Sequence, residues 1–148
     1  PTVVAPSVAR LVKATEESGR SCGALVAIMV IADETDEAAM AKWTLYKEGT
    51  DLEAIGWREA QAKDDPTRDP FAGPNKRRTL GSDKQPTQGG VLVGSYASCA
   101  RMLDDLAAVP GVEGIMLTFD EFVTGIENFG TRIQPLMRCR QGRALQAA

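Results

Sequence analysis

This chain of 148 residues contains no histidine, so imidazole is not among the side chains that could take part in a reaction. The Ser-His-Asp arrangement and the commonest general base are therefore ruled out. The three cysteines, Cys22, Cys99 and Cys139, are far apart and form no CxxC pair, so neither a disulfide framework nor a zinc site is indicated. Arg138 and Arg140 flank Cys139 and predict a lowered pKa for its thiol. Any reaction must use other side chains, a cofactor or residues outside this chain.

Acidic residues follow two apolar runs and are candidates for the rim of an active site. Asp33 and Asp120 each come directly after such a run. If the runs are parallel strands, their carboxyl ends meet at one edge of a sheet, where active sites of α/β proteins form. Thr118 and Phe119 lie at the same strand end as Asp120. The alternative is that the acids only cap the following helices and that Phe119 belongs to the core.

The basic run Lys76, Arg77 and Arg78 is a second candidate. It follows Gly73 and Pro74 in a stretch without periodicity. On a flexible loop these three cations could close onto an anionic group of a cofactor or substrate and exclude water. The alternative is a solvated basic run that neighbouring aspartates partly neutralise.

The elements that must position these residues alternate between helix and strand. Two apolar runs without polar alternation, 24–32 and 114–119, predict strands that are buried on both faces, as in parallel sheets. Five helices are predicted. Two are recognised by their apolar faces, which are Val8, Leu11 and Val12 in the first and Ala100, Leu103 and Leu106 in the other. Three are predicted over the stretches from Asp36 to Gly49, from Asp51 to Lys63 and from Phe122 to Met137. The fold class is therefore α/β, mostly helical, with two buried parallel strands. Two such strands cannot cover each other, so we expect the chain to be the end of a longer protein.

Residues 64–90 are polar and rich in proline, which predicts a long lid loop between the two strands.

The net charge of -3 gives no general attraction to nucleic acid or anionic lipid. No apolar run is long enough to cross a bilayer, and the first residues do not form a signal peptide. These features predict a cytoplasmic protein without nucleic-acid or membrane partners.

Several segments resemble one enzyme family in the same order along the chain. They are residues 30–36, 42–47, 92–97, 101–104, 114–120, 129–130 and 132–137. Together they resemble the flavin-dependent monooxygenases of the bacterial luciferase-like family, and within it most the pyrimidine monooxygenases that open the uracil ring. Residues 68–90 do not follow this pattern, which leaves other nitrogen heterocycles, sulfur compounds and substituted aromatic compounds open as substrates.

The resemblance implies the C-terminal part of a TIM-type (β/α)8 barrel, with residues 1–148 as one portion of a single barrel domain. It implies reduced FMN as cofactor, O2 as co-substrate and no metal. The implied partners are a separate NAD(P)H-dependent flavin reductase, a small organic substrate and further copies in a homo-oligomer. Most FMN-binding and catalytic residues would lie outside this chain, so the fragment alone should be inactive. Two alternatives stay open, a flavin- or deazaflavin-dependent reductase on the same barrel and a non-enzymatic α/β interaction domain.

Overall fold

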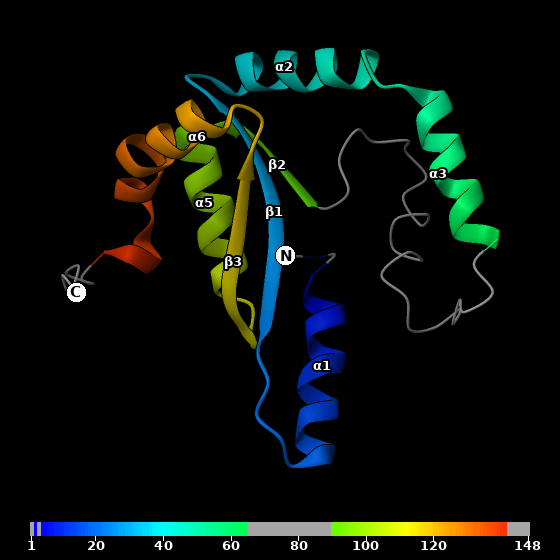
Figure 1. The fold of residues 1–148 in the computed structure, drawn as a ribbon. Coiled ribbons are helices and arrows are strands. Elements are labelled where there is room, and N and C mark those ends of the chain that lie inside the picture. The colour runs from blue at the N-terminus through cyan, green and yellow to red at the C-terminus, as the bar shows by residue number, and fades with distance from the viewer. Residues whose placement is uncertain (1, 3, 65–89, 142–148) are drawn as a thin grey trace.

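A three-stranded parallel sheet is the centre of the molecule (Figure 1). The computed structural model describes residue 2 and residues 4–64 and 90–141. Strand β1 (Ala24–Asp33) lies in the middle, with β2 (Gly90–Ser95) on one side and β3 (Val112–Phe119) on the other. Both neighbours run parallel to β1. The predicted α/β class is confirmed at this level, whereas residues 65–89 of the predicted lid lie outside the described residues.

Local sequence signals set the helix ends. The helices are α1 (Ala5–Ser18), α2 (Asp36–Glu48), α3 (Leu52–Asp64), α5 (Tyr96–Ala107) and α6 (Phe122–Asn128). Helix α1 ends at Gly19, whose φ of 67° is a left-handed conformation that glycine adopts without strain. Helix α2 begins after Thr35, whose hydroxyl accepts a hydrogen bond of 3.1 Å from the Ala38 N–H. The helices predicted from Asp36 to Gly49 and from Asp51 to Lys63 are thus confirmed to within one residue at each end.

Both predicted strands are present, but the prediction of only two strands is wrong. Residues 90–95 form the third strand and pair with β1 in register from Ile28 with Gly90 to Asp33 with Ser95. Three apolar residues between glycines were too short a run to indicate a strand. The pairing depends on the free edge of β1, which is a tertiary feature.

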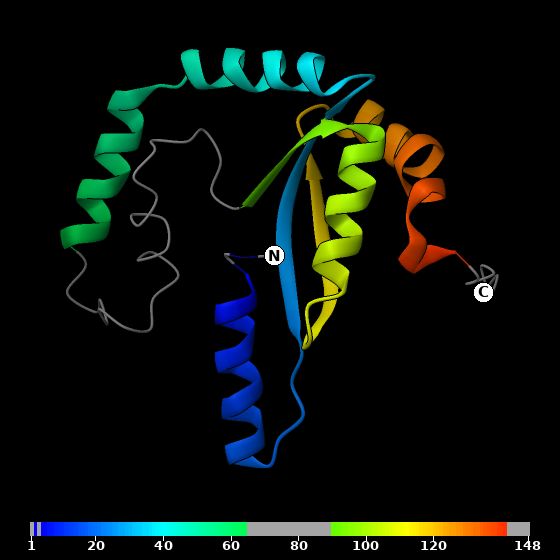
Figure 2. The ribbon, with the colours of Figure 1, turned by 180° about the vertical axis from the view of Figure 1, so that it is seen from behind.

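The core lies between one face of the sheet and α5, which crosses that face in Figure 2. Ile28 and Val30 of β1 pack with Cys99 and Leu103 of α5 in one buried cluster. Leu103 is only 1% exposed, as its place on the predicted apolar face requires. This packing fixes the strand ends relative to the start of α5.

The opposite face of the sheet is uncovered within the described residues, as Figure 1 shows. Leu25 is 70% exposed and Met116 is 50% exposed, although both belong to strands. Leu25 pairs with Gly114, and Ala27 pairs with Met116, so the two exposed side chains share this face. We call the surface formed by Leu25, Ala27 and Met116 the open sheet face.

The last predicted helix is shorter than expected. Helix α6 ends at Asn128 and continues as a π-helical turn (Phe129–Ile133) and two short 3₁₀ turns (Gln134–Leu136 and Arg138–Arg140). Pro135 has no N–H to donate, so an α-helix cannot continue through it without losing a hydrogen bond. Ile133 is still 1% exposed and joins the core. The apolar spacing was recognised, but the helix type was not.

Candidate functional site

Two carboxylates stand at the same end of the sheet. Asp33 is the last residue of β1, and Asp120 directly follows β3. The pairing of Val30 with Phe119 brings these strand ends side by side. This is the edge at which parallel α/β proteins bind ligands.

Helix α2 crosses this edge and holds both carboxylates. Lys42 Nζ lies 2.8 Å from Asp33 Oδ2 and donates to the Ala32 carbonyl oxygen at 3.3 Å. The Tyr46 hydroxyl donates to Asp120 Oδ2 at 2.9 Å. Lys42 and Tyr46 are four residues apart and therefore lie on one face of the helix. One helical face thus ties the end of β1 to the end of β3.

These contacts shift the proton affinities of the groups involved. The hydrogen bond from Lys42 lowers the pKa of Asp33. The same bond raises the pKa of Lys42. The bond to Asp120 raises the pKa of Tyr46, because it stabilises the protonated hydroxyl. Asp33 and Lys42 are therefore charged at neutral pH, while Tyr46 stays protonated as a donor.

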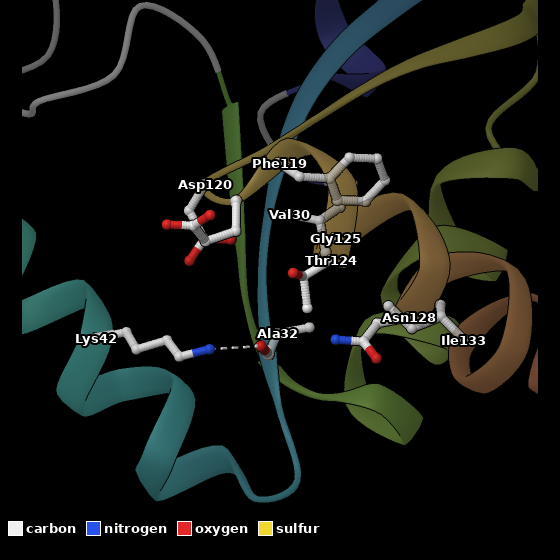
Figure 3. A pocket seen from close by; sticks show the side chains of 10 residues that line it. Val30, Ala32, Lys42, Phe119, Asp120, Thr124, Gly125, Asn128 and Ile133 are labelled. Carbon is white, nitrogen blue, oxygen red and sulfur yellow. Dashed lines mark hydrogen bonds between the residues drawn. The ribbon is translucent and has the colours of Figure 1, made fainter.

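A small cavity of about 70 Å³ opens beside this face of α2 (Figure 3). Its wall combines apolar residues from the strands with polar side chains from α2, α6 and the end of β3. The lining residues are Val30, Ala32, Lys42, Phe119, Asp120, Glu121, Thr124, Gly125, Asn128 and Ile133. In Figure 3 the amide of Asn128 points from α6 toward the strand end that carries Ala32. The arrangement offers hydrogen-bonding groups opposite an apolar wall.

The structure brings together some of the predicted rim residues. Asp120 and Phe119 line the cavity, and Asp33 is linked to it through Lys42. Phe119 also packs on Phe129, with ring centroids 6.1 Å apart, so its core role is confirmed as well. Thr118 is exposed and does not line the cavity. The candidates Lys76, Arg77 and Arg78 lie outside the described residues.

Among the lining and supporting residues that were not predicted, four are polar side chains on helices. Lys42, Tyr46, Thr124 and Asn128 come from helices, and helical patterning alone does not separate a site residue from a surface residue. The spacing of Lys42 and Tyr46 was a readable signal for a shared helix face. Their carboxylate partners, however, are defined only by the folded chain.

The start of α5 is occupied by an internal carboxylate. Asp36 Oδ1 accepts a 2.6 Å hydrogen bond from the Ser95 N–H, and Asp36 Oδ2 accepts one of 3.2 Å from the Ser98 hydroxyl. Ser95 also caps the helix, since its hydroxyl accepts from the Ser98 N–H at 3.2 Å. The described residues therefore do not fit FMN: this N-terminus is already paired, and the cavity is far smaller than a flavin.

Two of the cysteines, Cys99 and Cys139, have raised pKa values in the structure. Cys99 is fully buried, and burial raises its pKa to about 11. The prediction of a lowered pKa for Cys139 is wrong, because burial and the hydrogen bond to Asp104 raise this pKa and outweigh the opposite effect of Arg140.

Among the described residues no group of three or more Cys, Asp or Glu side chains could hold a metal ion. No helix in the described ranges has the length and apolar character needed to span a bilayer.

Comparison with known proteins confirms the resemblance seen in the sequence. The chain is 53% identical over 145 residues to pyrimidine monooxygenase RutA of Escherichia coli O81 (strain ED1a), covering 95% of this chain and 36% of that protein. It is 54% identical over 145 residues to pyrimidine monooxygenase RutA of Enterobacter cloacae, covering 95% of this chain and 38% of that protein. The chain thus spans little more than a third of the length of these relatives. The crystal structure of DmoA from Hyphomicrobium sulfonivorans has a similar fold, with a TM-score of 0.66 and 23% identity over 97% of this chain and 36% of that chain. No family model matches the sequence.

Proposed function

We propose that this chain, a relative of the pyrimidine monooxygenases along 95% of its length, is part of a flavin-dependent monooxygenase that acts on a pyrimidine-like heterocycle. The observation that carries the proposal is the 53% identity over 145 residues. The position of the candidate site at the carboxyl ends of β1 and β3 is consistent with it, because enzymes with parallel sheets bind substrate at that edge.

The proposal includes the fold of the complete protein, a (β/α)8 barrel of the luciferase-like type to which this chain contributes a C-terminal portion. The open sheet face supports it, since parallel strands are normally covered on both faces. In the described residues β2 and β3 each have a neighbour on one side only. Further strands of the complete protein would cover Leu25 and Met116 and pair with these free edges.

The cofactor in this proposal is reduced FMN, with O2 as co-substrate, and a separate NAD(P)H-dependent reductase supplies the reduced flavin. The cofactor would carry the reaction with oxygen, while the protein binds and orients the substrate and excludes water. Because the described residues do not form a flavin site, the rest of the protein must hold FMN. Lys76, Arg77 and Arg78 stay predicted contacts to the flavin phosphate or substrate. We place the complete enzyme in the cytoplasm as a homo-oligomer.

Oxygen consumption by the complete polypeptide tests the proposal. The protein is supplied with reduced FMN, and O2 uptake is followed with uracil, other heterocycles, sulfones and halogenated phenols. We expect uptake that depends on a pyrimidine, and a product that gains one oxygen atom from ¹⁸O2 by mass spectrometry. The 148-residue chain alone serves as the inactive control. Hydride exchange without O2 uptake would indicate a reductase, and absence of flavin binding would favour the interaction domain.

A further inference from the structure

Four consecutive residues where β1 leads into α2 are each held by a side-chain contact. We call residues 33–36 the β1–α2 junction. Their partners come from α2, from the start of α5 and from the C-terminal turns. The contacts are Asp33 with Lys42, Glu34 with Arg132, Thr35 with the Ala38 N–H, and Asp36 with the Ser95 N–H. Connections at strand ends are usually among the more mobile parts of a protein. A junction held at every residue therefore indicates a fixed geometry at this edge of the sheet.

Arg132 is itself held in place by an aromatic ring. Its guanidinium carbon lies over the Tyr96 ring, 5.1 Å from the ring centroid. Tyr96 directly follows Ser95, which pairs with Asp33 across the sheet. Glu34 directly follows Asp33, so Glu34 and Tyr96 leave two neighbouring strand ends. Arg132 contacts both residues and thereby joins the carboxyl ends of β1 and β2.

The backbone that carries Arg132 is not an ordinary α-helix. Residues Phe129–Ile133 form a π-helical turn, a rare geometry that is frequent at functional sites. Both ends of this turn are anchored in the protein. The Phe129 ring lies 6.1 Å from the Phe119 ring, and Ile133 is buried in the core. Arg132 therefore extends from a fixed backbone.

The ion pair is too exposed to act mainly as a stabilising contact. The side chains of Arg132 and Glu34 are 46% and 65% exposed. Water screens such pairs, and they contribute little to the free energy of unfolding. Their main effect is to restrict the junction. The Glu34 N–H donates to Asp33 Oδ1 at 2.7 Å, so a restriction of Glu34 is passed on to the Asp33 carboxylate.

We propose that Arg132 is a positioning residue for the substrate edge of the sheet. Through Glu34 it holds the β1–α2 junction, and with it the Asp33 carboxylate, in the geometry that the complete enzyme uses to bind its substrate. Parallel α/β proteins bind ligands at this edge. The inference rests on the proposed function for the substrate, and it gives a role to a residue that this function leaves unassigned.

The variant Arg132→Gln tests the restriction directly, since it removes the charge and keeps a polar side chain. We expect amide hydrogen exchange in peptides covering residues 33–38 of the complete protein to become roughly 2- to 5-fold faster, as the loss of a partly exposed ion pair allows. The unfolding midpoint should change by less than about 2 °C. Arg132→Lys keeps a positive charge opposite Glu34 and should restore most of the protection.

The functional measurement is the steady-state kinetics of the complete protein with reduced FMN and a pyrimidine. Arg132→Gln should raise KM roughly 10-fold with a smaller change in kcat, because the junction borders the edge where the substrate binds. Glu34→Gln should have the same effect, and the double variant should be no worse, because both changes remove one contact. Arg132→Lys should recover most of the KM.

The matched control is Arg10→Gln. Arg10 is exposed and belongs to α1, which lies at the opposite end of the sheet from α6 in Figure 1. The same chemical change at this position should leave the exchange of residues 33–38 and the KM unchanged.

Unchanged exchange in Arg132→Gln would overturn the positioning role. Faster exchange at the junction with an unchanged KM would overturn its relevance to the substrate. Faster exchange throughout the protein, with a large drop in the unfolding midpoint, would show a purely structural role and overturn the inference as well. If the parent protein consumes no O2 with any substrate, the proposed function fails, whereas the exchange experiment still decides whether Arg132 positions the junction.

Discussion

Asp36 at the start of α2 and Ser95 at the start of α5 are joined by a 2.6 Å hydrogen bond, although 59 residues separate them in the chain. The bond holds two helix N-termini together through one negative charge, which the positive ends of both helix dipoles stabilise. It also fixes the junction between β2 and α5, where Ser98 adds a second contact to the same carboxylate.

We predict that Asp36→Ala lowers the thermal unfolding midpoint of the complete protein. The Ser95 N–H bond lowers the pKa of Asp36 below that of the unfolded chain. The contribution is therefore complete above about pH 4 and is lost as the pH falls through the folded-state pKa. Calorimetry should show a larger difference between the two proteins at pH 7 than at pH 3. Glu37→Gln, the neighbouring acid in the same helical turn, is the control. An equal deficit at both pH values would contradict this explanation.

Replacement of Asp104 should lower the free energy of unfolding more than replacement of any other acidic residue in this part of the protein. It is 8% exposed and accepts hydrogen bonds from the Arg138 N–H at 2.9 Å and the Cys139 N–H at 3.0 Å. Asp104→Ala leaves these donors without an acceptor, so we expect a loss of about 1–3 kcal/mol in the free energy of unfolding. Urea unfolding measures it. Exposed Asp105, changed to Asn, should have almost no effect.

The pH dependence of Asp104 follows from the same contacts. Burial raises its pKa, but the hydrogen bonds from Cys139 and Arg138 outweigh burial and hold it at about 2. A lowered folded-state pKa stabilises the protein above the unfolded value near 4, and the stabilisation disappears between about pH 4 and pH 2. The stability difference between the protein and Asp104→Asn should shrink across that range. A constant difference would show that ionisation of Asp104 is not what stabilises the C-terminal turns.

The Lys42 and Asp33 pair should contribute modestly to stability. Their side chains are 41% and 27% exposed, so water screens the attraction. We expect Lys42→Met to cost about 0.5–1 kcal/mol at neutral pH. The pair raises the pKa of Lys42 and lowers that of Asp33, so its contribution should be present at pH 7 and be lost both above the ordinary lysine pKa and below the ordinary aspartate pKa. Lys47→Met, at the end of the same helix, is the control. A loss of several kcal/mol would mean that Lys42 supports more than this pair.

Gly125 in α6 and Gly130 in the following π-helical turn should respond differently to replacement by alanine. A Cβ at Gly125 would overlap Cβ and Cγ of Phe119, so α6 would have to move away from β3. We expect Gly125→Ala to destabilise the fold by about 1–3 kcal/mol. At Gly130 a Cβ would meet no heavy atom within 4 Å, and Gly130→Ala should be neutral or slightly stabilising. Comparison of the two unfolding midpoints tests the packing of α6 directly.

The sequence was sufficient to predict a helix or strand where the signal lay within that element or next to it. The apolar runs predicted β1 and β3 correctly, and the local residues Thr35 and Gly19 set the start of α2 and the end of α1. Contacts between distant segments could not be predicted, because no pattern links Tyr46 to Asp120 across 74 residues. β2 was missed for the same reason, since its short apolar run becomes a strand only at the edge of β1.

The rim of the site was predictable in part. Asp33 and Asp120 were found because acids at the ends of parallel strands meet at one edge. Asn128 and Thr124 gave no signal of their own, since polar residues on a short surface helix are common. Their relevance comes from the cavity that α6 makes with β3.

The strand order of the sheet also sets the timing of its assembly during translation. Central β1 is made first, yet its partners follow roughly 60 to 90 residues later, since Ile28 pairs with Gly90 and Ala24 with Val112. At roughly 5–20 residues per second the ribosome needs about 3 to 18 seconds to supply them. During that interval a strongly apolar strand lacks the partners that pair with both of its edges in the folded sheet. Nascent chains of this protein should therefore engage chaperones before residue 90 is synthesised.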